Sequence, residues 1–204
     1  MQIFKFGGAS VKDAEGVRNL ANVLKSVGYK NTLIIVSAMG KTTNAMEKVV
    51  SNYFDAKHEL HSSVQEVKKF HNNILLDLFE NETHAVFENI DDLFQELLQF
   101  FDHNKSPNYN FVYDQVIGFG ELISTSIISH YLNHIGLSNS WLDVRNCIKT
   151  DDYYRNAKVH WNQTQELISK KVDTSKLNIT QGFIGSNSNN FTTTLGREGS
   201  DYTA

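Results

Sequence analysis

Residues 1–36, MQIFKFGGASVKDAEGVRNLANVLKSVGYKNTLIIV, determine the fold class because they combine the patterns of a strand, a helix and a second strand. The apolar run Met1–Phe6 ends at two glycines and predicts a buried strand. After Ser10, which we expect to cap a helix, apolar residues recur at helical spacing until Gly28, where the helix should end. The run LIIV at 33–36 lacks polar alternation, which is typical of a strand covered on both faces. The three elements predict a right-handed βαβ unit.

The segment from about 42 to 104 is charged and helical in pattern. Its clearest part is an apolar stripe over 86–101 with helical spacing. Another helix is predicted to begin after Gly120 and to run towards Gly136. Further strands are expected at 141–144 and 179–184, and residues 192–195 should precede a loop at 196–199 and a helix that starts near Asp201. We therefore expect an α/β fold, a three-layer αβα sandwich with a mostly parallel sheet and a helical insertion.

Composition excludes several classes of protein. The chain has 204 residues and a net charge of −4, with 19 basic and 23 acidic side chains and no basic patch suited to nucleic acid. No apolar run approaches the roughly 18–20 residues that span a membrane, and the N-terminus does not resemble a secretory signal. Cys147 is the only cysteine, which excludes an intramolecular disulfide. We expect a cytoplasmic, soluble domain that binds neither nucleic acid nor membrane.

Three loops rich in small and polar residues follow predicted strand ends or precede a predicted helix: KFGGAS at 5–10, SAMGKTTN at 37–44 and GREGSD at 196–201. Paired glycines and backbone N–H groups at a helix start favour the close approach of an anion. Each loop alone is also compatible with an ordinary turn. Because ligands of open α/β sheets bind outside the carboxyl ends of the strands, we expect the three loops to converge on one crevice.

Two nucleotide-binding patterns fail. A P-loop ending at Gly40-Lys41-Thr42 would need its first glycine where Ile35 stands. A dinucleotide fingerprint at 118–120 would need its third glycine where Ile123 stands. Two histidine pairs have helical spacing, His58 with His61 and His130 with His134, but neither has an evident third ligand. We therefore expect no metal held by the protein alone.

Five motifs together resemble aspartate kinases, which belong to the amino-acid kinase family: KFGGAS at 5–10, VSAMGKTTN at 36–44, GFGELIST at 118–125, TQGFIG at 180–185 and TLGREGSDYTA at 194–204. The resemblance implies transfer of the γ-phosphoryl group of ATP, with Mg²⁺, to the side-chain carboxylate of L-aspartate. The product, 4-phospho-L-aspartate, opens the synthesis of lysine, threonine and methionine. The expected partners are L-aspartate, ATP and further subunits in a homodimer or higher oligomer. An aspartate carboxylate, with a reference pKa of about 3.9, needs no general base at neutral pH.

The resemblance also implies roles for individual residues. Lys5 would contact the transferring phosphoryl group, and Asp201 would orient Lys5 or a magnesium-bound water. The expected phosphate and ATP contacts are Lys5, Gly7, Gly8, Ser10, Ser37 and Gly40. The expected substrate pocket comprises Thr43, Glu121, Phe183, Arg197, Gly199 and Ser200. Within it, Arg197 would bind a carboxylate through its planar fork, and Glu121, placed at the mouth of a helix, would hold the ammonium group.

Each role has a structural alternative. Lys5 could be a solvated lysine at a strand end, and Glu121 could be a carboxylate favoured only by the helix dipole. Asp201 could be only an N-cap. Arg197 could pair with Glu198 or with Glu121.

Two residues depart from the family pattern. Ala9 replaces the threonine of KFGGTS, and Glu198 replaces the second glycine of GRGGSD. A glutamate adopts a positive φ only at a cost, and it adds an anion near a site for anions. We expect the Glu198 side chain to point to solvent.

Family kinase domains continue for about another half-length beyond SDYTA. Residues 1–204 are therefore expected to be the N-terminal substrate-binding part of the domain, without the nucleotide-binding half or the ACT regulatory domains, and with a sheet edge open to self-association. The alternatives are another amino-acid kinase that acts on a different carboxylate and a non-catalytic aspartate-binding module.

Overall fold

A computed structural model describes all residues, 1–204. Its main sheet has four strands in the order β1-β2-β4-β3, all parallel. The strands are β1 (Gln2–Phe6), β2 (Thr32–Val36), β4 (Leu177–Gln181) and β3 (Asn139–Leu142). Both central strands, β2 and β4, are buried along their whole length, which confirms the prediction made from the unbroken LIIV run.

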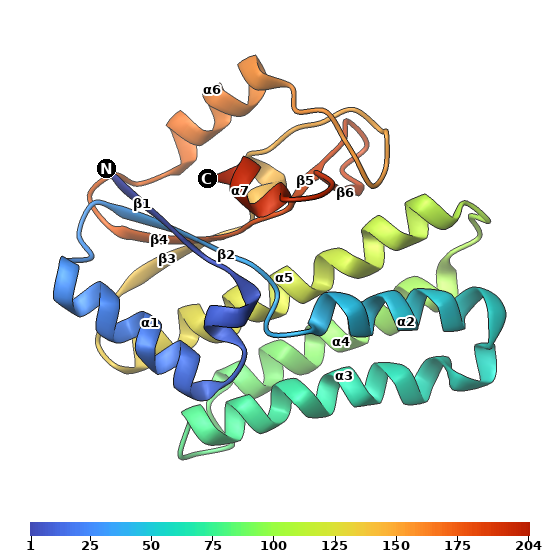
Figure 1. Cartoon of the computed structure of the whole chain (residues 1–204), viewed down its shortest axis with the longest axis horizontal. Helices are drawn as coiled ribbons and strands as arrows, with labels where there is room; N and C mark the ends of the chain where they lie inside the picture. The colour runs from blue at the N-terminus through green and yellow to red at the C-terminus, as the bar shows by residue number, and fades with distance from the viewer.

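Helices and a hairpin cover the two faces of this sheet (Figure 1). On one face lie α1 (Ala14–Val27) and α5 (Tyr109–His134), whose apolar side chains share one core with Ile34, Val36 and Ile179 of the sheet. On the other lie α6 (Trp161–Lys171), the short α7 (Gly199–Thr203) and an antiparallel hairpin. The hairpin pairs β5 (Ile184–Ser186) with β6 (Thr192–Thr194). The three-layer αβα arrangement is as predicted.

The predicted helical insertion consists of α2 (Thr42–Asp55), α3 (Lys57–Leu78) and α4 (Ala85–His103). These helices pack beside α5 in a bundle that extends away from the sheet (Figure 1). The stripe predicted over 86–101 supplies buried side chains from Val86 to Phe101 to the core. None of the helices combines the length and the apolar character that crossing a bilayer requires.

The beginnings of two helices were predicted wrongly. The Asn108 side chain caps α5, accepting hydrogen bonds from the backbone N–H groups of Asn110 (3.0 Å) and Phe111 (3.2 Å). The helix therefore begins about three turns before Gly120. The Asp13 carboxylate, not Ser10, caps α1 by accepting from the Gly16 N–H at 2.8 Å. Ser10 lies in a short 3-10 helix, Gly8–Val11.

The ends of two strands also differ from the prediction. The strand expected at 141–144 ends at Leu142, and Val144 begins a 3-10 turn, Val144–Asn146. The strand expected at 179–184 is interrupted after Gln181, because the chain turns at Gly182 and Phe183, where φ is +73°. This turn ends β4 beside the loops that follow β1 and β2.

Candidate functional site

The loops that follow β1 and β2 are joined to each other through their backbones. The Ser37 N–H donates to the Phe6 carbonyl at 3.1 Å, and the Gly40 N–H donates to the Gly8 carbonyl at 3.0 Å. A Cβ atom at Gly8 would lie 2.5 Å from the Ala38 carbonyl oxygen, so only glycine fits. The first two predicted anion loops therefore form one continuous surface.

The first turn of α7 closes this surface from the other side. The Lys5 ammonium lies 2.8 Å from the Asp201 carboxylate, with the two side chains 33% and 59% exposed. The Ser37 hydroxyl donates to the Ser200 hydroxyl at 2.9 Å. Asp201 is not the N-cap of α7, because Glu198 holds that position. These contacts bring Lys5, Ser37, Ser200 and Asp201 together, as the sequence predicted.

Gly7 lies beside the Lys5 ammonium. A Cβ atom at Gly7 would have only the Lys5 Nζ atom within 4 Å, at 3.8 Å. The space in front of this backbone is therefore open and faces the Lys5 ammonium. Such a surface suits a phosphate group, since a bare backbone and a mobile cation can both approach it.

Glu121 lies in the middle of α5 and not at the mouth of a helix, which corrects the sequence prediction. Its side chain is only 2% exposed. One carboxylate oxygen accepts from the Ala38 N–H at 3.3 Å, and the other has no hydrogen-bond partner. Burial raises the pKa of Glu121 to about 8. A buried, unpaired oxygen directly beneath the second loop is the feature of the site that most clearly calls for a cationic ligand or a proton.

Arg197 and Glu198 are both exposed. Glu198 adopts a left-handed conformation with φ of +60°, and its side chain is in solvent as expected. Arg197 makes no salt bridge, so neither of its predicted structural pairings is present. It lines a groove of about 430 Å³ together with Lys158, Trp161 and Tyr202.

Four other predicted residues, Gly40, Phe183, Ser10 and Thr43, take no part in the Lys5–Asp201 and Ser37–Ser200 contacts. Gly40 has a positive φ of +56° and forms the turn of the second loop. Phe183 is half-buried, and a Cβ atom at Gly199 would lie 2.7 Å from its ring. Ser10 is exposed and Thr43 is half-buried in the first turn of α2. No side-chain hydrogen bond joins Ser10 or Thr43 to the remainder of the site.

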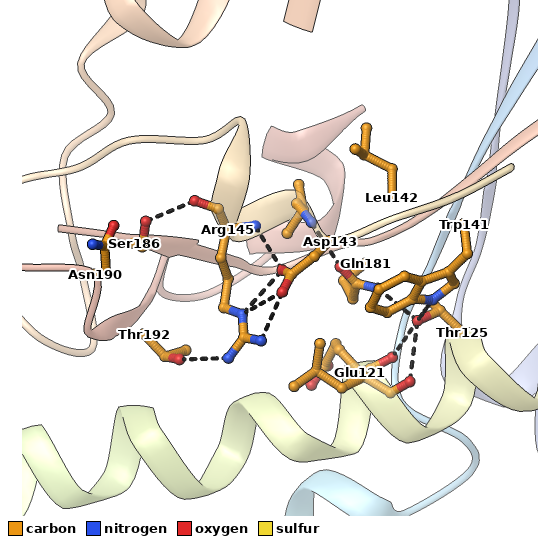
Figure 2. A network of polar contacts seen from close by, with 12 residues as sticks. Glu121, Thr125, Trp141, Leu142, Asp143, Arg145, Gln181, Ser186, Asn190 and Thr192 are labelled. Atoms are coloured by element: carbon orange, nitrogen blue, oxygen red, sulfur yellow. Dashed lines mark hydrogen bonds and ion pairs between the residues drawn. The ribbon is translucent and has the colours of Figure 1, made fainter. Parts of the chain in front are cut away.

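A polar network at the ends of β3 and β4 was missed by the sequence analysis (Figure 2). The Gln181 amide donates to the Thr125 hydroxyl at 2.7 Å and accepts from the Val144 N–H at 2.8 Å. Asp143 and Arg145 form an ion pair at 2.7 Å. The sequence Asp-Val-Arg at 143–145, where the predicted strand ended, was the available signal. The network joins α5 to the carboxyl edge of the sheet.

A second missed residue is Asp114, a carboxylate on α5 whose side chain is completely buried. The sequence offered one indication of its burial, because Asp114 is the only charged residue in a mainly apolar stretch, 111–120. It contacts the segments that lead to Arg197, and these contacts are described below.

The whole chain, residues 1–204, matches the amino acid kinase family. Aspartokinase 2, chloroplastic, of Arabidopsis thaliana is 33% identical over 99% of this chain and 38% of its own length. Lysine-sensitive aspartokinase 3 of Escherichia coli is 30% identical over 99% of this chain and 44% of its own. The chain thus spans less than half the length of these relatives.

Solved structures give the same result. Escherichia coli aspartokinase III in complex with aspartate and ADP (R-state) superposes with a TM-score of 0.88 at 28% identity, over 100% of this chain and 45% of that chain. The aspartate kinase of Clostridium acetobutylicum, at 21% identity and a TM-score of 0.77, shares the fold. The resemblance to aspartokinases that the motifs indicated is confirmed, and the chain belongs to the amino acid kinase family.

Proposed function

We propose that this chain carries the substrate-binding part, and a share of the phosphate site, of an aspartate kinase. The observation that carries the proposal is the convergence of Lys5, the two glycine loops and the first turn of α7 at one edge of the parallel sheet. The named relatives are aspartokinases, and one solved neighbour holds aspartate and ADP. Both facts favour this acceptor over another carboxylate.

The residues present fit a nucleoside triphosphate. The open backbone at Gly7 beside the Lys5 ammonium would accept phosphate oxygens, and Ser10, Ser37 and Gly40 line the same loops. ATP would supply the γ-phosphoryl group. Mg²⁺, which proteins commonly hold through one or two carboxylates plus the phosphates, would have Asp201 within reach.

The chemistry needs positioning and positive charge. A side-chain carboxylate oxygen of L-aspartate attacks the γ-phosphorus, the bond from that phosphorus to the bridging oxygen breaks, and ADP leaves with the electron pair. No proton moves, because the attacking carboxylate is already ionised. The Lys5 ammonium would stabilise the charge that develops on the transferring group, and Asp201 would hold that ammonium in place.

The substrate would be held at both ends of its backbone. Arg197 would bind the α-carboxylate and Glu121 the ammonium, while Thr43, Phe183, Gly199 and Ser200 would shape the remaining pocket. For Glu121 this requires the ligand to reach its unpartnered oxygen beneath the loop. A cytoplasmic location and assembly into a homodimer or higher oligomer complete the proposal. The exposed edge strand β1, with Ile3 47% exposed, favours self-association.

Calorimetry of L-aspartate binding tests the proposal, on the protein expressed from its complete gene. Succinate and L-glutamate serve as competing ligands. R197A is compared with K158A, because both side chains line the same groove. We expect saturable binding of L-aspartate, weak binding of succinate, strongly weakened but measurable binding of L-aspartate in R197A, and unchanged binding in K158A. ADP release that depends on L-aspartate would establish the kinase. Binding without turnover would favour the non-catalytic alternative, and preference for another acceptor would favour a different amino-acid kinase.

A further inference from the structure

Asp114 is the only carboxylate side chain on α5 besides Glu121, and both are buried. The two residues are seven positions apart, which is about two helical turns, so they share one face of the helix. Glu121 lies under the loop that follows β2. Asp114 lies under two different segments, the loop before α6 and the end of β6.

The Asp114 carboxylate accepts all its hydrogen bonds from these two segments. The Thr194 N–H donates to Oδ2 at 2.8 Å, and the Thr194 hydroxyl donates to Oδ1 at 2.8 Å. The Arg155 N–H is shared between the two oxygens at 3.1 and 3.0 Å. The Arg155 guanidinium instead lies over the Tyr113 ring, 4.3 Å from its centroid. The carboxylate is therefore hydrogen-bonded only by neutral donors, and the Arg155 guanidinium forms no salt bridge with it.

The two segments meet again immediately before Arg197. The Ala157 N–H donates to the Thr194 carbonyl at 2.9 Å. A Cβ atom at Gly196 would lie 2.7 Å from the Asn156 side-chain oxygen and 3.3 Å from the Arg155 carbonyl. On the opposite side, the Leu195 N–H donates to the Phe183 carbonyl at 2.9 Å. The backbone that leads to Arg197 is thus fixed on both sides, and Asp114 supplies the buried attachment to α5.

We propose that Asp114 is a positioning residue for L-aspartate, because it attaches the Arg197 loop to the helix that carries Glu121. The inference rests on the proposed function. In it, α5 sets the distance between the group that binds the substrate ammonium and the group that binds its α-carboxylate. Asp114 itself touches no substrate. Its effect is largest at the amino-acid end of the site, because Arg197 lies three residues after Thr194, whereas Lys5 and the glycine loops are attached to β1 and β2.

The test is D114N in the protein expressed from its complete gene. The amide keeps the shape of the side chain but places an NH₂ group against N–H and O–H donors. We expect the KM for L-aspartate to rise about tenfold, with the KM for ATP and the kcat changed less than about twofold. T194V, which removes one donor, should show a smaller rise in the same parameter. T194S keeps the hydroxyl and should behave as the unsubstituted protein, which provides the control if D114N folds poorly.

A double-mutant cycle separates positioning from general damage. If Asp114 acts through Arg197, D114N should not weaken L-aspartate binding further when R197A is already present. Additive losses, or equal rises of both KM values, would overturn the inference. So would unchanged amide hydrogen exchange over residues 194–197 in D114N, whether or not the protein is active. Failure of the unsubstituted protein to phosphorylate L-aspartate would instead count against the proposed function, and against this inference with it.

Discussion

Gly182 and Ser200 approach each other so closely that a Cβ atom at Gly182 would lie 2.7 Å from both the Cβ and the Oγ atoms of Ser200. The first turn of α7 therefore packs directly against the end of β4. Because Ser200 also accepts from Ser37, and its neighbour Asp201 pairs with Lys5, one close contact aligns the ends of three strands. A shift of α7 would reach all of these side chains.

We predict that G182A lowers both stability and activity. The added methyl group must displace Ser200, which should reduce the free energy of unfolding by about 1–3 kcal/mol and kcat by at least about tenfold, since α7 carries Asp201 away from Lys5. Urea unfolding and an ADP-release assay measure the two effects. In G182A/S200G the stability should recover more than the activity does. Equal stability of G182A and the unsubstituted protein would show that α7 does not pack closely against Gly182.

The Lys5 ammonium is predicted to act on the reaction and hardly on the fold. In K5M we expect kcat to fall about 10²–10³-fold, the usual effect of removing one stabilising group from a transition state. The loss of stability should stay below about 1 kcal/mol, because the pair with Asp201 is partly exposed. D201N should show a smaller decrease in kcat. K170M, which breaks a surface pair on α6, is the control and should retain full activity.

The sequence predicted those parts of the molecule in which local pattern and tertiary environment agree. The glycines and small polar residues after β1 and β2 lie where they were expected, because they directly follow strands whose apolar runs are evident in the sequence. The start of α5 was missed because residues 112–132 are buried on nearly every side, so the helix has no polar face that would reveal its period. The burial of Glu121 was missed for the same reason, because this residue lies in the middle of that buried helix.

Local sequence patterns could not predict contacts between residues that are far apart in the chain. Asp114 meets Thr194 across 80 positions, and Gln181 meets Thr125 across 56. Nothing near either residue in the sequence indicates its partner. The exposure of Arg197 depends on how the loop at 196–199 leaves β6, which is set by packing against Asn156 and Phe183.

Binding of L-aspartate is predicted to release a proton from Glu121. Its pKa of about 8 means that the carboxyl is mostly protonated in the free protein at pH 7. Pairing with the substrate ammonium requires the ionised form, so the apparent affinity should fall about tenfold for each pH unit below 8. Calorimetry in buffers of different ionisation enthalpy measures the released proton directly.

The variants E121Q and E166Q test whether Glu121 is the group that releases the proton. E121Q should bind L-aspartate weakly and with no pH dependence between 6 and 8, whereas E166Q, on the exposed face of α6, should behave as the unsubstituted protein. The contribution of Glu121 to the stability of the free protein should decline as pH rises from about 4.5 towards 8, because only the unfolded chain loses this proton in that window. E121Q should lack this decline. Proton release that persists in E121Q would assign it to another group.

Acid is predicted to loosen the second loop through His71. This histidine of α3 is fully buried, and burial lowers its pKa to about 4. Its Nδ1 donates to the Val67 carbonyl at 2.8 Å, and its Nε2 lies 3.3 Å from the Thr42 hydroxyl, which itself donates to the Met39 carbonyl beside Gly40. Between pH 6.5 and 4 only the unfolded chain takes up the proton. The contribution of His71 to the free energy of unfolding should therefore fall by about 3 kcal/mol on acidification through that range.

H71Q should lose less stability over the same range, because glutamine cannot take up the proton and its amide can still donate to Val67. H61Q, an exposed position on the same helix, should retain the full loss. Urea unfolding at intervals between pH 4 and 7 gives the slopes, and the difference between H71Q and H61Q removes the contribution of the carboxylates common to both. Identical slopes would exclude His71 as the source. A flatter slope in H71Q alone would show that the ring beneath Thr42 must stay neutral for the folded chain to keep its full stability.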